Sequence, residues 1–401
     1  MAARPIADLL ELSPDFFRDP YPVYAALRAR GPVHHVRTPA DLEMWLVVGH
    51  EACRTAFTDP RLSRDWLRPG AVNEAMGVGD DLPALANMLM SDPPDHTRLR
   101  RLVARGFTPR RVEEMTERVQ RIADELLDAM AAQPERRADL VMSFAFPLPM
   151  TVICELLGVP ELDRVAFRAW SNEVVAPTDP EIQANAFREM AAYLRELVVA
   201  KRASPAEDLL SSLIHTVDEG GDRLSPDELI GMAFLILVAG HETTVNLIGN
   251  GVRALFAHPG QFAELRADPG LLEGAVEEML RYDGPLENST MRLALEDVEI
   301  GGETIPAGAT VLIGIADGNR DPARFKDPDR FDIHRDARGH LAFGHGLHHC
   351  LGAPLARLEG RIAIRGLLDR FPDLAPDTDE AALSWLPGML IRGVRELPVR
   401  W

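Results

Sequence analysis

The most informative run in this chain is Phe343-Gly344-His345-Gly346-Leu347-His348-His349-Cys350-Leu351-Gly352, which stands immediately before a helix-forming segment. Gly344 and Gly346 lack a Cβ atom, so the backbone can form left-handed turns and approach a flat ligand closely. Gly352 clears space beside the sulfur of Cys350. The run therefore predicts a loop that holds a metal.

Cys350 is placed beside the start of a predicted helix. Apolar residues recur at helical spacing through residues 353–371, which is typical of an amphipathic helix. Free N–H groups and the helix dipole favour an anion at a helix N-terminus, so we expect a lowered pKa for this thiol. A small buried hydrophobe is the alternative for a lone cysteine, but two glycines, an aromatic residue and a histidine at fixed offsets make a far more specific pattern.

The complete Phe-Gly-x-Gly-x-His-x-Cys-x-Gly pattern resembles the haem-thiolate signature of the cytochrome P450 family, with no position missing. The resemblance implies haem b (iron protoporphyrin IX) as cofactor, with Cys350 as the iron ligand and His348 reaching a haem propionate. It also implies the triangular-prism fold of that family, mainly α with small β-sheets. Because its motifs run from His96 to Cys350 and no linker is visible, we expect residues 1–401 to form one domain.

Composition restricts the cellular setting. Three widely spaced cysteines give no disulfide framework and fit a reducing compartment, so we expect a cytoplasmic protein. The segment Met1–Ile6 shows no signal peptide, and the longest apolar run, Met232–Ala239, is far shorter than the ~20 residues that span a bilayer. A formal charge of -19 argues against nucleic acid as a partner. We expect a soluble protein, and a monomer, without membrane contact.

The pattern of apolar residues predicts long helices and a few short strands. Helical spacing dominates 113–132, 161–172, 181–201, 226–257 and 353–371. Strand-like runs occur at 45–48, 298–300 and 310–313, with glycine and proline marking turns. In the longest predicted helix, Ser225 is the N-cap, Pro226 occupies the first helical position and Glu228 stands at N3.

That long helix contains the polar segment Ala239-Gly240-His241-Glu242-Thr243-Thr244. Polar groups in a buried helix need a reason. One alternative is a local bend, since a threonine can bond back to the carbonyl of residue i−4. The resemblance instead implies an oxygen-activating site, in which Ala239 and Gly240 leave a groove for dioxygen, Thr243 donates a hydrogen bond toward it, and Glu242 helps relay protons. It implies Thr243, Glu242 and Cys350 as the catalytic residues.

A hydrophobic substrate pocket is expected around this helix. Helical periodicity places Leu235 and Ala239 on the stripe of Thr243, with Val238 close by. The irregular region 70–90 and two later segments supply the other candidates. The full substrate set is Leu235, Val238, Ala239, Leu286, Glu287, Asn288, Thr290, Met389, Leu390, Met88 and Met90. A mainly apolar set of this kind favours a mid-sized or large hydrophobic molecule.

Haem anchoring requires positive donors for two buried propionates. His96 and Arg100 stand at i and i+4 on one predicted helix face after Pro94, Arg292 precedes a strand-like run, and His348 completes a set of four that matches the family positions. Each residue alone is more commonly an ordinary surface residue. The full set expected around haem is His96, Arg100, Arg292, His348, Cys350, Phe343, Gly344, Gly346, Gly352, Ala239 and Leu89.

Two further groups of charged residues are expected to support the site. Glu278 and Arg281 share a helix face at i and i+3, and by resemblance Arg330 joins them in a buried structural network. The stretch 96–111 contains six arginines and no acid. It is either a solvated face or, on so acidic a protein, a docking site for a small acidic electron donor such as a ferredoxin.

The family implies a monooxygenase that activates dioxygen and hydroxylates or epoxidises a hydrophobic small molecule, with electrons from NAD(P)H through ferredoxin reductase and ferredoxin. The style of residues 342–357 and 391–393 resembles bacterial members that modify macrolides and other natural products. A peroxide-driven haem-thiolate enzyme is one alternative, although such enzymes commonly lack the Glu242-Thr243 pair. A non-catalytic haem sensor or carrier is the other.

Overall fold

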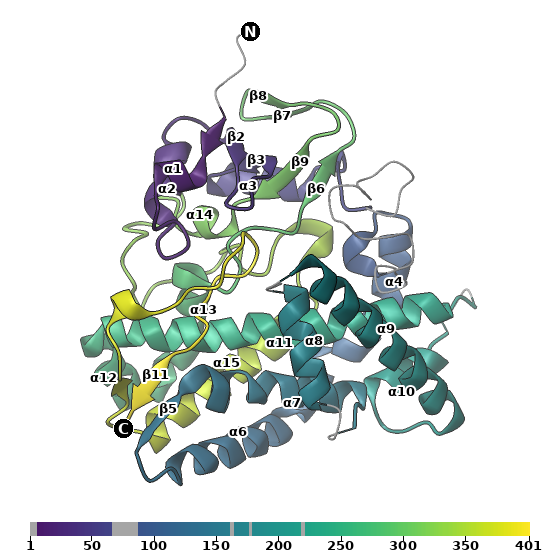
Figure 1. The fold of residues 1–401 in the computed structure, drawn as a ribbon, viewed down its shortest axis with the longest axis vertical. Coiled ribbons are helices and arrows are strands. Elements are labelled where there is room, and N and C mark those ends of the chain that lie inside the picture. The colour runs from purple at the N-terminus through teal and green to yellow at the C-terminus, as the bar shows by residue number, and fades with distance from the viewer. Residues whose placement is uncertain (1–5, 66–86, 161–163, 176–178, 218–220) are drawn as a thin grey trace.

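The computed structural model describes residues 6–65, 87–160, 164–175, 179–217 and 221–401. The predicted pocket region 70–90 is therefore described only from Asn87 onward, the N-terminal segment only at Ile6, and the predicted helix 161–172 only from Arg164. Figure 1 shows a broad helical part and a narrower β-rich part that contains the first elements of the chain. The two parts agree with the mainly helical fold expected from the sequence.

Helices are the main secondary structure of the described residues. They are α1 Leu9–Leu12, α2 Tyr21–Arg28, α3 His50–Thr58, α4 Asp95–Ala104, α5 Pro109–Glu114, α6 Thr116–Ala131, α7 Pro147–Leu157, α8 Arg164–Val175, α9 Pro180–Ala203, α10 Leu209–His215, α11 Pro226–Ala257, α12 Pro259–Ala267, α13 Leu272–Asp283, α14 Ile315–Asn319 and α15 Ala353–Arg370. Short 3-10 turns include η2 Met88–Met90 and η7 Gly346–His348, and η4 Val141–Ala145 is a π-helical turn.

The described strands form three small sheets. They are β1 Ala7–Asp8, β2 Val33–Arg37, β3 Glu43–Val47, β4 Leu62–Ser63, β5 Arg137–Asp139, β6 Arg292–Ala294, β7 Val298–Ile300, β8 Glu303–Ile305, β9 Thr310–Ile313, β10 Ala375–Pro376 and β11 Pro398–Arg400. The main sheet has the order β1-β2-β3-β9-β6-β4. Its β3 pairs in parallel with β9, so segments more than 260 residues apart meet, and β6 delivers Arg292 beside them.

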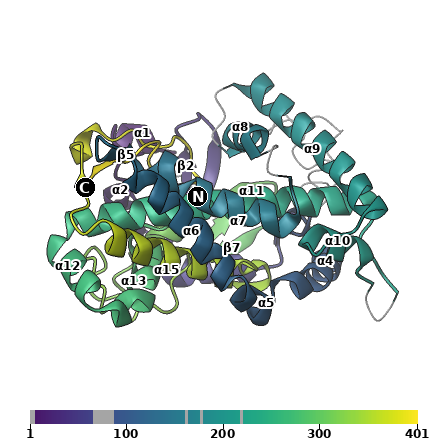
Figure 2. The same cartoon turned by 90° about the horizontal axis from the view of Figure 1, so that it is seen from below.

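Helix α11 is the central element. Its start is fixed by a capping box, in which the Ser225 side chain accepts from the Glu228 backbone and the Glu228 side chain accepts from the Ser225 backbone, and Pro226 follows at the first helical position. Helices α7, α9, α13 and α15 all pack against α11, so α11 carries apolar residues on most of its faces. Figures 1 and 2 show α11 crossing the whole helical part. By length and composition it could cross a membrane, but 61% of its most apolar window is buried inside the protein, as in a core helix.

The predicted helices and strands are confirmed, with one difference. The segment 113–132 was expected to be a single helix, but α5 ends at Glu114 and α6 begins at Thr116. Met115 at the junction keeps a helical backbone and acts as the C-cap of α5, its N–H bonding to Val112 and Glu113 carbonyls. Apolar spacing predicts which residues are buried, but it does not register this local change in backbone hydrogen bonding.

Candidate functional site

The loop before α15 has the close-packed backbone that its glycines suggest. Gly344 and Gly346 have φ angles of 70° and 76°, a region that residues with a Cβ rarely adopt. A Cβ at Gly346 would also lie 2.9 Å from Thr58 Cγ2, whereas the atom nearest to a Cβ at Gly352 is Cys350 Sγ at 3.9 Å. The Cys350 N–H donates to the Phe343 carbonyl at 2.9 Å and closes the loop.

The thiol of Cys350 is accessible but lies deep among protein atoms. Burial raises its pKa, while hydrogen bonds from the backbone at Gly352, and then at Ala353, lower it. The expected donors at the helix N-terminus are therefore present. The expectation that they lower the thiol pKa overall is wrong, because the loss of solvation outweighs them. A coordinated metal ion deprotonates a thiol directly, so these donors stabilise a metal-bound thiolate in addition to the metal.

The four predicted propionate ligands come together from three parts of the chain. The rings of His96 on α4 and His348 in η7 are 4.2 Å apart between centroids. Arg100, one turn after His96, donates to the His349 carbonyl at 2.7 Å and ties α4 to the cysteine loop. Arg292 at the start of β6 is buried, with one terminal nitrogen 3.3 Å from the Leu62 carbonyl.

Arg64 belongs to the same cluster, although sequence analysis did not single it out. It is 5% exposed, and one terminal nitrogen donates to Thr290 Oγ1 at 2.6 Å. Burial, and then the nearby Arg292, hold the pKa of its guanidinium well below the usual range. Burial followed by Arg64, His96 and Arg292 lowers the pKa of His348 to about 2. Since Arg64 follows β4 and no motif surrounds it, only the folded chain reveals it.

Several donors in this cluster have no acceptor. Both ring nitrogens of His96, Nε of Arg64, and Nε and one terminal nitrogen of Arg292 are buried without a hydrogen-bond partner. Buried donors are nearly always paired in folded proteins, and adjacent buried cations repel each other. A ligand carrying two carboxylates would satisfy both requirements. The residues present therefore fit a haem whose propionates face this cluster while its iron meets Cys350.

The predicted stripe on α11 is a solvent-accessible stretch in an otherwise largely buried helix. Ala239 is exposed and Leu235, Val238, Gly240 and Thr243 are partly exposed, although the residues on either side of this group are mostly buried. Thr243 Oγ1 donates to the Ala239 carbonyl at 3.0 Å, one turn back. This is the back-bond of the local-bend alternative, and the helix continues through it from Pro226 to Ala257.

Gly240 has a packing role in addition to the one expected. A Cβ at this position would lie 2.8 Å from Cδ1 of Ile153 on α7. The missing side chain therefore lets α11 and α7 pack closely. Gly240 is also partly exposed beside Ala239, and its contribution to a dioxygen groove stays a prediction.

The candidate pocket segments lie around that stripe. Met88, Leu89 and Met90 form η2 and are partly buried, with the Met88 N–H 3.3 Å from Met232 Sδ on α11. Residues 286–290 lie beside residues 389–391, because Leu286 forms a β-bridge with Ile391 and the Glu287 N–H donates to the Leu390 carbonyl at 2.9 Å. Met389 is partly buried and Leu390 is 38% exposed.

Three of the polar pocket candidates are already engaged with protein groups. The Glu287 carboxyl accepts from the Tyr24 hydroxyl, and Asn288 Nδ2 donates to the Tyr24 hydroxyl at 3.1 Å and the Met389 carbonyl at 2.8 Å. Both residues are buried. Thr290 is engaged by Arg64. The prediction that Glu287 offers a polar contact to a substrate is corrected, because its carboxyl is bonded to Tyr24 on α2. Asn288 Oδ1 has no hydrogen-bond partner among the described residues, so the substrate contact of Asn288 stays a prediction.

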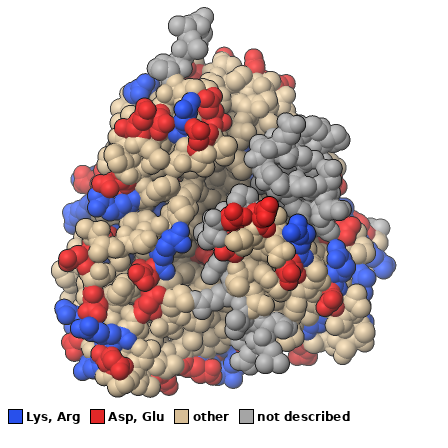
Figure 3. All heavy atoms as spheres, in the orientation of Figure 1, with Lys and Arg blue, Asp and Glu red and all other residues tan. Residues whose placement is uncertain are grey.

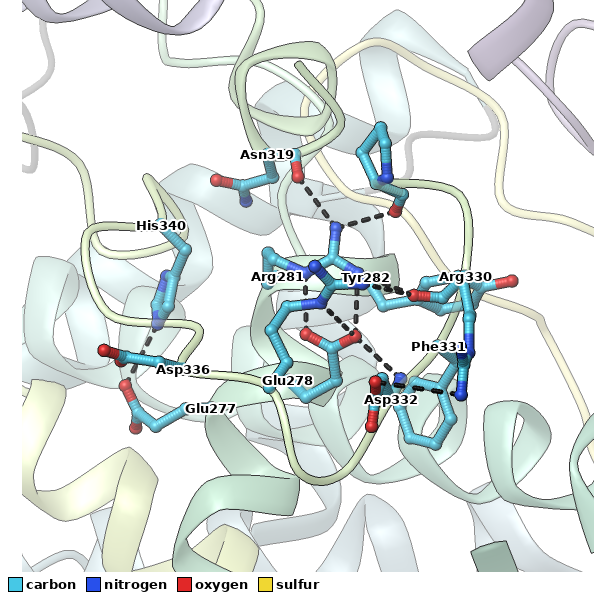
Figure 4. Close-up of polar contacts among 12 residues, drawn as sticks. Glu277, Glu278, Arg281, Tyr282, Asn319, Arg330, Phe331, Asp332, Asp336 and His340 are labelled. Atoms are coloured by element: carbon cyan, nitrogen blue, oxygen red, sulfur yellow. Dashed lines mark hydrogen bonds and ion pairs between the residues drawn. The ribbon is translucent and has the colours of Figure 1, made fainter. Parts of the chain in front are cut away.

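Glu278 and Arg281 form a buried ion pair, but the second arginine is not the one predicted. Both side chains are fully buried, and two nitrogens of Arg281 donate to the carboxylate at 2.6 and 2.8 Å (Figure 4). The Arg330 side chain is 69% exposed, and only its backbone carbonyl accepts from Arg281. Arg335 supplies the second guanidinium, at 3.2 Å from Glu278 Oε1. The placement of Arg330 in the network is therefore corrected to Arg335.

The arginine-rich stretch contains partly buried and exposed members. Arg98 binds Glu228 and lies 3.5 Å from Asp222, so it joins α4 to α11. The exposed members are Arg101, Arg105, Arg110 and Arg111. Elsewhere, on the face shown in Figure 3, Lys/Arg and Asp/Glu are interspersed, and a recess separates the β-rich part from the helices.

Comparisons with known proteins agree with this geometry. A family model described as cytochrome P450 matches residues 178–386. The chain is 57% identical to the cytochrome P450 monooxygenase PikC of Streptomyces venezuelae, over 100% of this chain and 95% of that protein. It is 46% identical to the 6-deoxyerythronolide B hydroxylase of Saccharopolyspora erythraea, over 97% of each. The solved structure of the tirandamycin C-bound P450 monooxygenase TamI superposes with a TM-score of 0.88 at 43% identity, over 98% of this chain and 99% of that one.

Proposed function

This chain belongs to the cytochrome P450 family and is a monooxygenase, and we propose that its substrate is a macrolide or another polyketide natural product. The expected P450 fold is confirmed by the solved relatives. We further propose that residues 1–401 act as one domain, in the cytoplasm and as a monomer. The set of buried, unpaired donors beside the Cys350 loop supports the haem site on which the proposed reaction depends.

The cofactor is haem, and we propose that it is haem b. Cys350 would bind the iron, and His96, Arg100, Arg292 and His348 would receive the propionates, because their donors lack acceptors or line the same cluster. Arg64 adds a fifth donor. When bound, haem would supply the reductive activation of dioxygen, which the Cys350 thiolate would promote by donating electron density.

We propose that two polar residues of α11 deliver protons to the site. The Thr243 hydroxyl lies on the accessible stripe and is held by the Ala239 carbonyl at 3.0 Å. The adjacent Glu242 is buried except for a small accessible fraction of its side chain. A carboxyl in this position can take a proton from solvent-connected groups and pass it toward Thr243. Glu242 is therefore proposed as the proton donor, and Thr243 as the residue that orients the proton delivered by Glu242.

The substrate class is argued from the pocket wall. Leu235, Val238 and Ala239 line the accessible stripe of α11, and η2 adds two methionines and a leucine. Methionine side chains adapt to irregular apolar ligands. Because the acidic and amide groups nearby are engaged within the protein, recognition rests mainly on apolar contact. A large, mostly apolar polyketide ring matches that wall better than a small polar metabolite does.

Electron delivery requires redox partners, and we propose a ferredoxin and its NAD(P)H-dependent ferredoxin reductase. Arg100 connects α4 to the loop that carries Cys350. The exposed arginines of α4 and the following turns therefore lie next to the side of the site where the thiolate is held. A small acidic protein that docks on them would have a short path to the metal.

The test measures ligand binding by the absorption of the ferric haem protein, since displacement of axial water from the iron shifts that spectrum. The probes are 6-deoxyerythronolide B, tirandamycin C and, as a comparator without a polyketide ring, myristic acid. We expect a saturable shift with at least one polyketide at micromolar concentration. A shift with myristic acid alone would overturn the proposed substrate class.

A second measurement tests the chemistry. Product formation should require ferredoxin, ferredoxin reductase, NAD(P)H and oxygen. Sustained turnover with hydrogen peroxide alone, and none with the reductase system, would contradict the proposed electron path.

A further inference from the structure

His241 is fully buried in the middle of α11, one residue before Glu242. Its ring is held by contacts on several sides. Nδ1 lies 2.8 Å from the Leu237 carbonyl, and Nε2 lies 3.0 Å from Ser171 Oγ on α8. Nε2 is also 3.3 Å from Glu242 Oε1. The ring of Phe146 packs against it edge-to-face at 5.6 Å between centroids.

The partners determine where protons can sit on this ring. A carbonyl oxygen only accepts hydrogen bonds, so Nδ1 must carry a proton to bond to Leu237. In the neutral ring Nε2 is then an acceptor, and the Ser171 hydroxyl can donate to it. A carboxylate at Oε1 of Glu242 would face the same lone pair without a proton between them. The contact is favourable only when one further proton is present, on Glu242 or on Nε2.

We propose that His241 shares one proton with the Glu242 carboxyl and is thereby a positioning residue for proton delivery from that carboxyl. Transfer from Nε2 to Oε1 breaks an N–H bond and forms an O–H bond, so an imidazolium and a carboxylate become a neutral imidazole and a carboxylic acid. The net charge of the pair is unchanged. This inference rests on the proposed role of Glu242 as proton donor.

The arrangement also explains why a histidine in a fully buried helix face is useful here. Glu242 retains a small accessible fraction of its side chain, whereas His241 has none. Protons therefore exchange with solvent through the Glu242 carboxyl, and the His241 ring can hold the shared proton. Hydrogen bonds to Ser171 and Leu237 hold the ring in place, with Nε2 3.3 Å from Oε1.

The direct test is the infrared carboxylic acid band of the ferric haem protein, measured in H2O and D2O without substrate. We expect a band that disappears in Glu242→Gln and that shifts to higher frequency or vanishes in His241→Phe. Phenylalanine keeps the ring packing against Phe146 but cannot accept the proton. A band assigned to Glu242 that is identical in wild type and His241→Phe would overturn the inference.

A kinetic test separates proton sharing from a merely structural effect. It follows how fast the dithionite-reduced haem protein returns to its ferric spectrum after mixing with oxygen, a step that proton supply assists. His241→Phe should slow it about tenfold, the effect expected from losing one hydrogen bond to a charged group. In a Glu242→Gln background the same substitution should have no further effect, because interacting residues are not additive. Full additivity would contradict the inference.

Two controls identify which claim fails. Ser171→Ala removes the hydroxyl on the other side of Nε2 but keeps the pairing with Glu242, so it should slow reoxidation much less than His241→Phe does. If Glu242→Gln leaves the rate unaltered, the proposed proton-donor role of Glu242 fails. If Glu242→Gln slows it and His241→Phe does not, only the inference about His241 fails.

Discussion

At the scale of single residues, the site is defined by buried donor atoms that have no hydrogen-bond partner among the residues that the structure describes. Arg64 shows this most clearly, because it is a buried guanidinium with an unpartnered Nε and with Arg292 as a repelling neighbour. A buried charge without a partner is costly. Burial of the Arg64 guanidinium therefore costs folding free energy, and the two negative charges of a bound cofactor would offset that cost.

Replacing Arg64 by methionine tests this account. The change removes the charge and keeps much of the volume, so the haem-loaded protein should lose stability while the haem-free protein loses little. We expect haem to dissociate about tenfold faster, since a charge-assisted hydrogen bond is worth about 1.5–3 kcal/mol. The measurements are haem transfer to an acceptor protein and thermal unfolding of both forms. Arg98→Met, which loses an ion pair to Glu228, should instead destabilise both forms equally.

At the scale of elements, the buried acid of α13 holds together segments that reach it from different directions. Glu278 accepts hydrogen bonds from Arg281 on its own helix, from Arg335 and from the backbone of Asp332 (Figure 4). Arg281 also donates to the carbonyls of Asn319 and Pro328. The pair thus fixes the path of the chain between α14 and the cysteine loop.

Alanine substitutions at Arg335 and Arg330 should therefore have very different effects. Removing one partner of a buried ion pair costs about 3–5 kcal/mol, so Arg335→Ala should lower the free energy of unfolding by that order. Arg330→Ala removes an exposed side chain and should change it by less than about 0.5 kcal/mol. Chemical denaturation of the haem-loaded protein measures both. An equal loss of unfolding free energy in the two variants would show that the Arg330 side chain also belongs to the buried network.

Helix α15 carries a second buried acid, Glu359, with a different consequence. Burial raises the pKa of Glu359 to about 8, and its Oε2 has no hydrogen-bond partner. The folded protein therefore binds a proton that the unfolded chain releases near its ordinary pKa of 4.5. Between these two values the folded state holds more protons, so stability falls as pH rises from about 4.5 to about 8 and then levels off.

Glu359→Gln should abolish this pH dependence because the amide cannot ionise. At pH 5 the variant and the wild type should unfold at similar denaturant concentrations. At pH 8.5 the variant should be more stable by up to about 4 kcal/mol, at about 1.4 kcal/mol per pKa unit. Denaturant unfolding of the haem-loaded proteins across this pH range is the measurement. A constant difference between the two proteins at every pH would show that Glu359 does not titrate in this way.

At the scale of the whole molecule, sequence predicted the elements better than the contacts between them. The signature loop, the long capped helix and the i, i+4 pair of His96 and Arg100 depend on local spacing, and the structure places them as expected. Arg64 and Arg335 were missed because their partners lie far away in the chain. The close approach of Gly240 to Ile153 on α7 was not predicted, because periodicity does not show which neighbouring helix a residue meets.

The distribution of charge is also a property of the whole molecule, and it predicts how the electron donor binds. The chain carries a net charge of -19, so an acidic ferredoxin is repelled by the molecule as a whole and must find a local positive surface. Arg101 and Arg105 are exposed on and just after α4, and Arg100 links that helix to the cysteine loop. Added salt weakens such attraction within a Debye length of about 10 Å at 0.1 M.

Charge reversal on this surface should therefore slow reduction by ferredoxin without changing the enzyme itself. Arg101→Glu and Arg105→Glu should each reduce the rate of haem reduction at low salt by about tenfold, a typical size for electrostatic steering. The difference from wild type should shrink as salt is added. Arg37→Glu on β2, in the β-rich part of the molecule, is the matched control and should leave the rate nearly unchanged. Stopped-flow reduction under carbon monoxide measures all three, and equal rates for the α4 variants and wild type would move the docking site elsewhere on the surface.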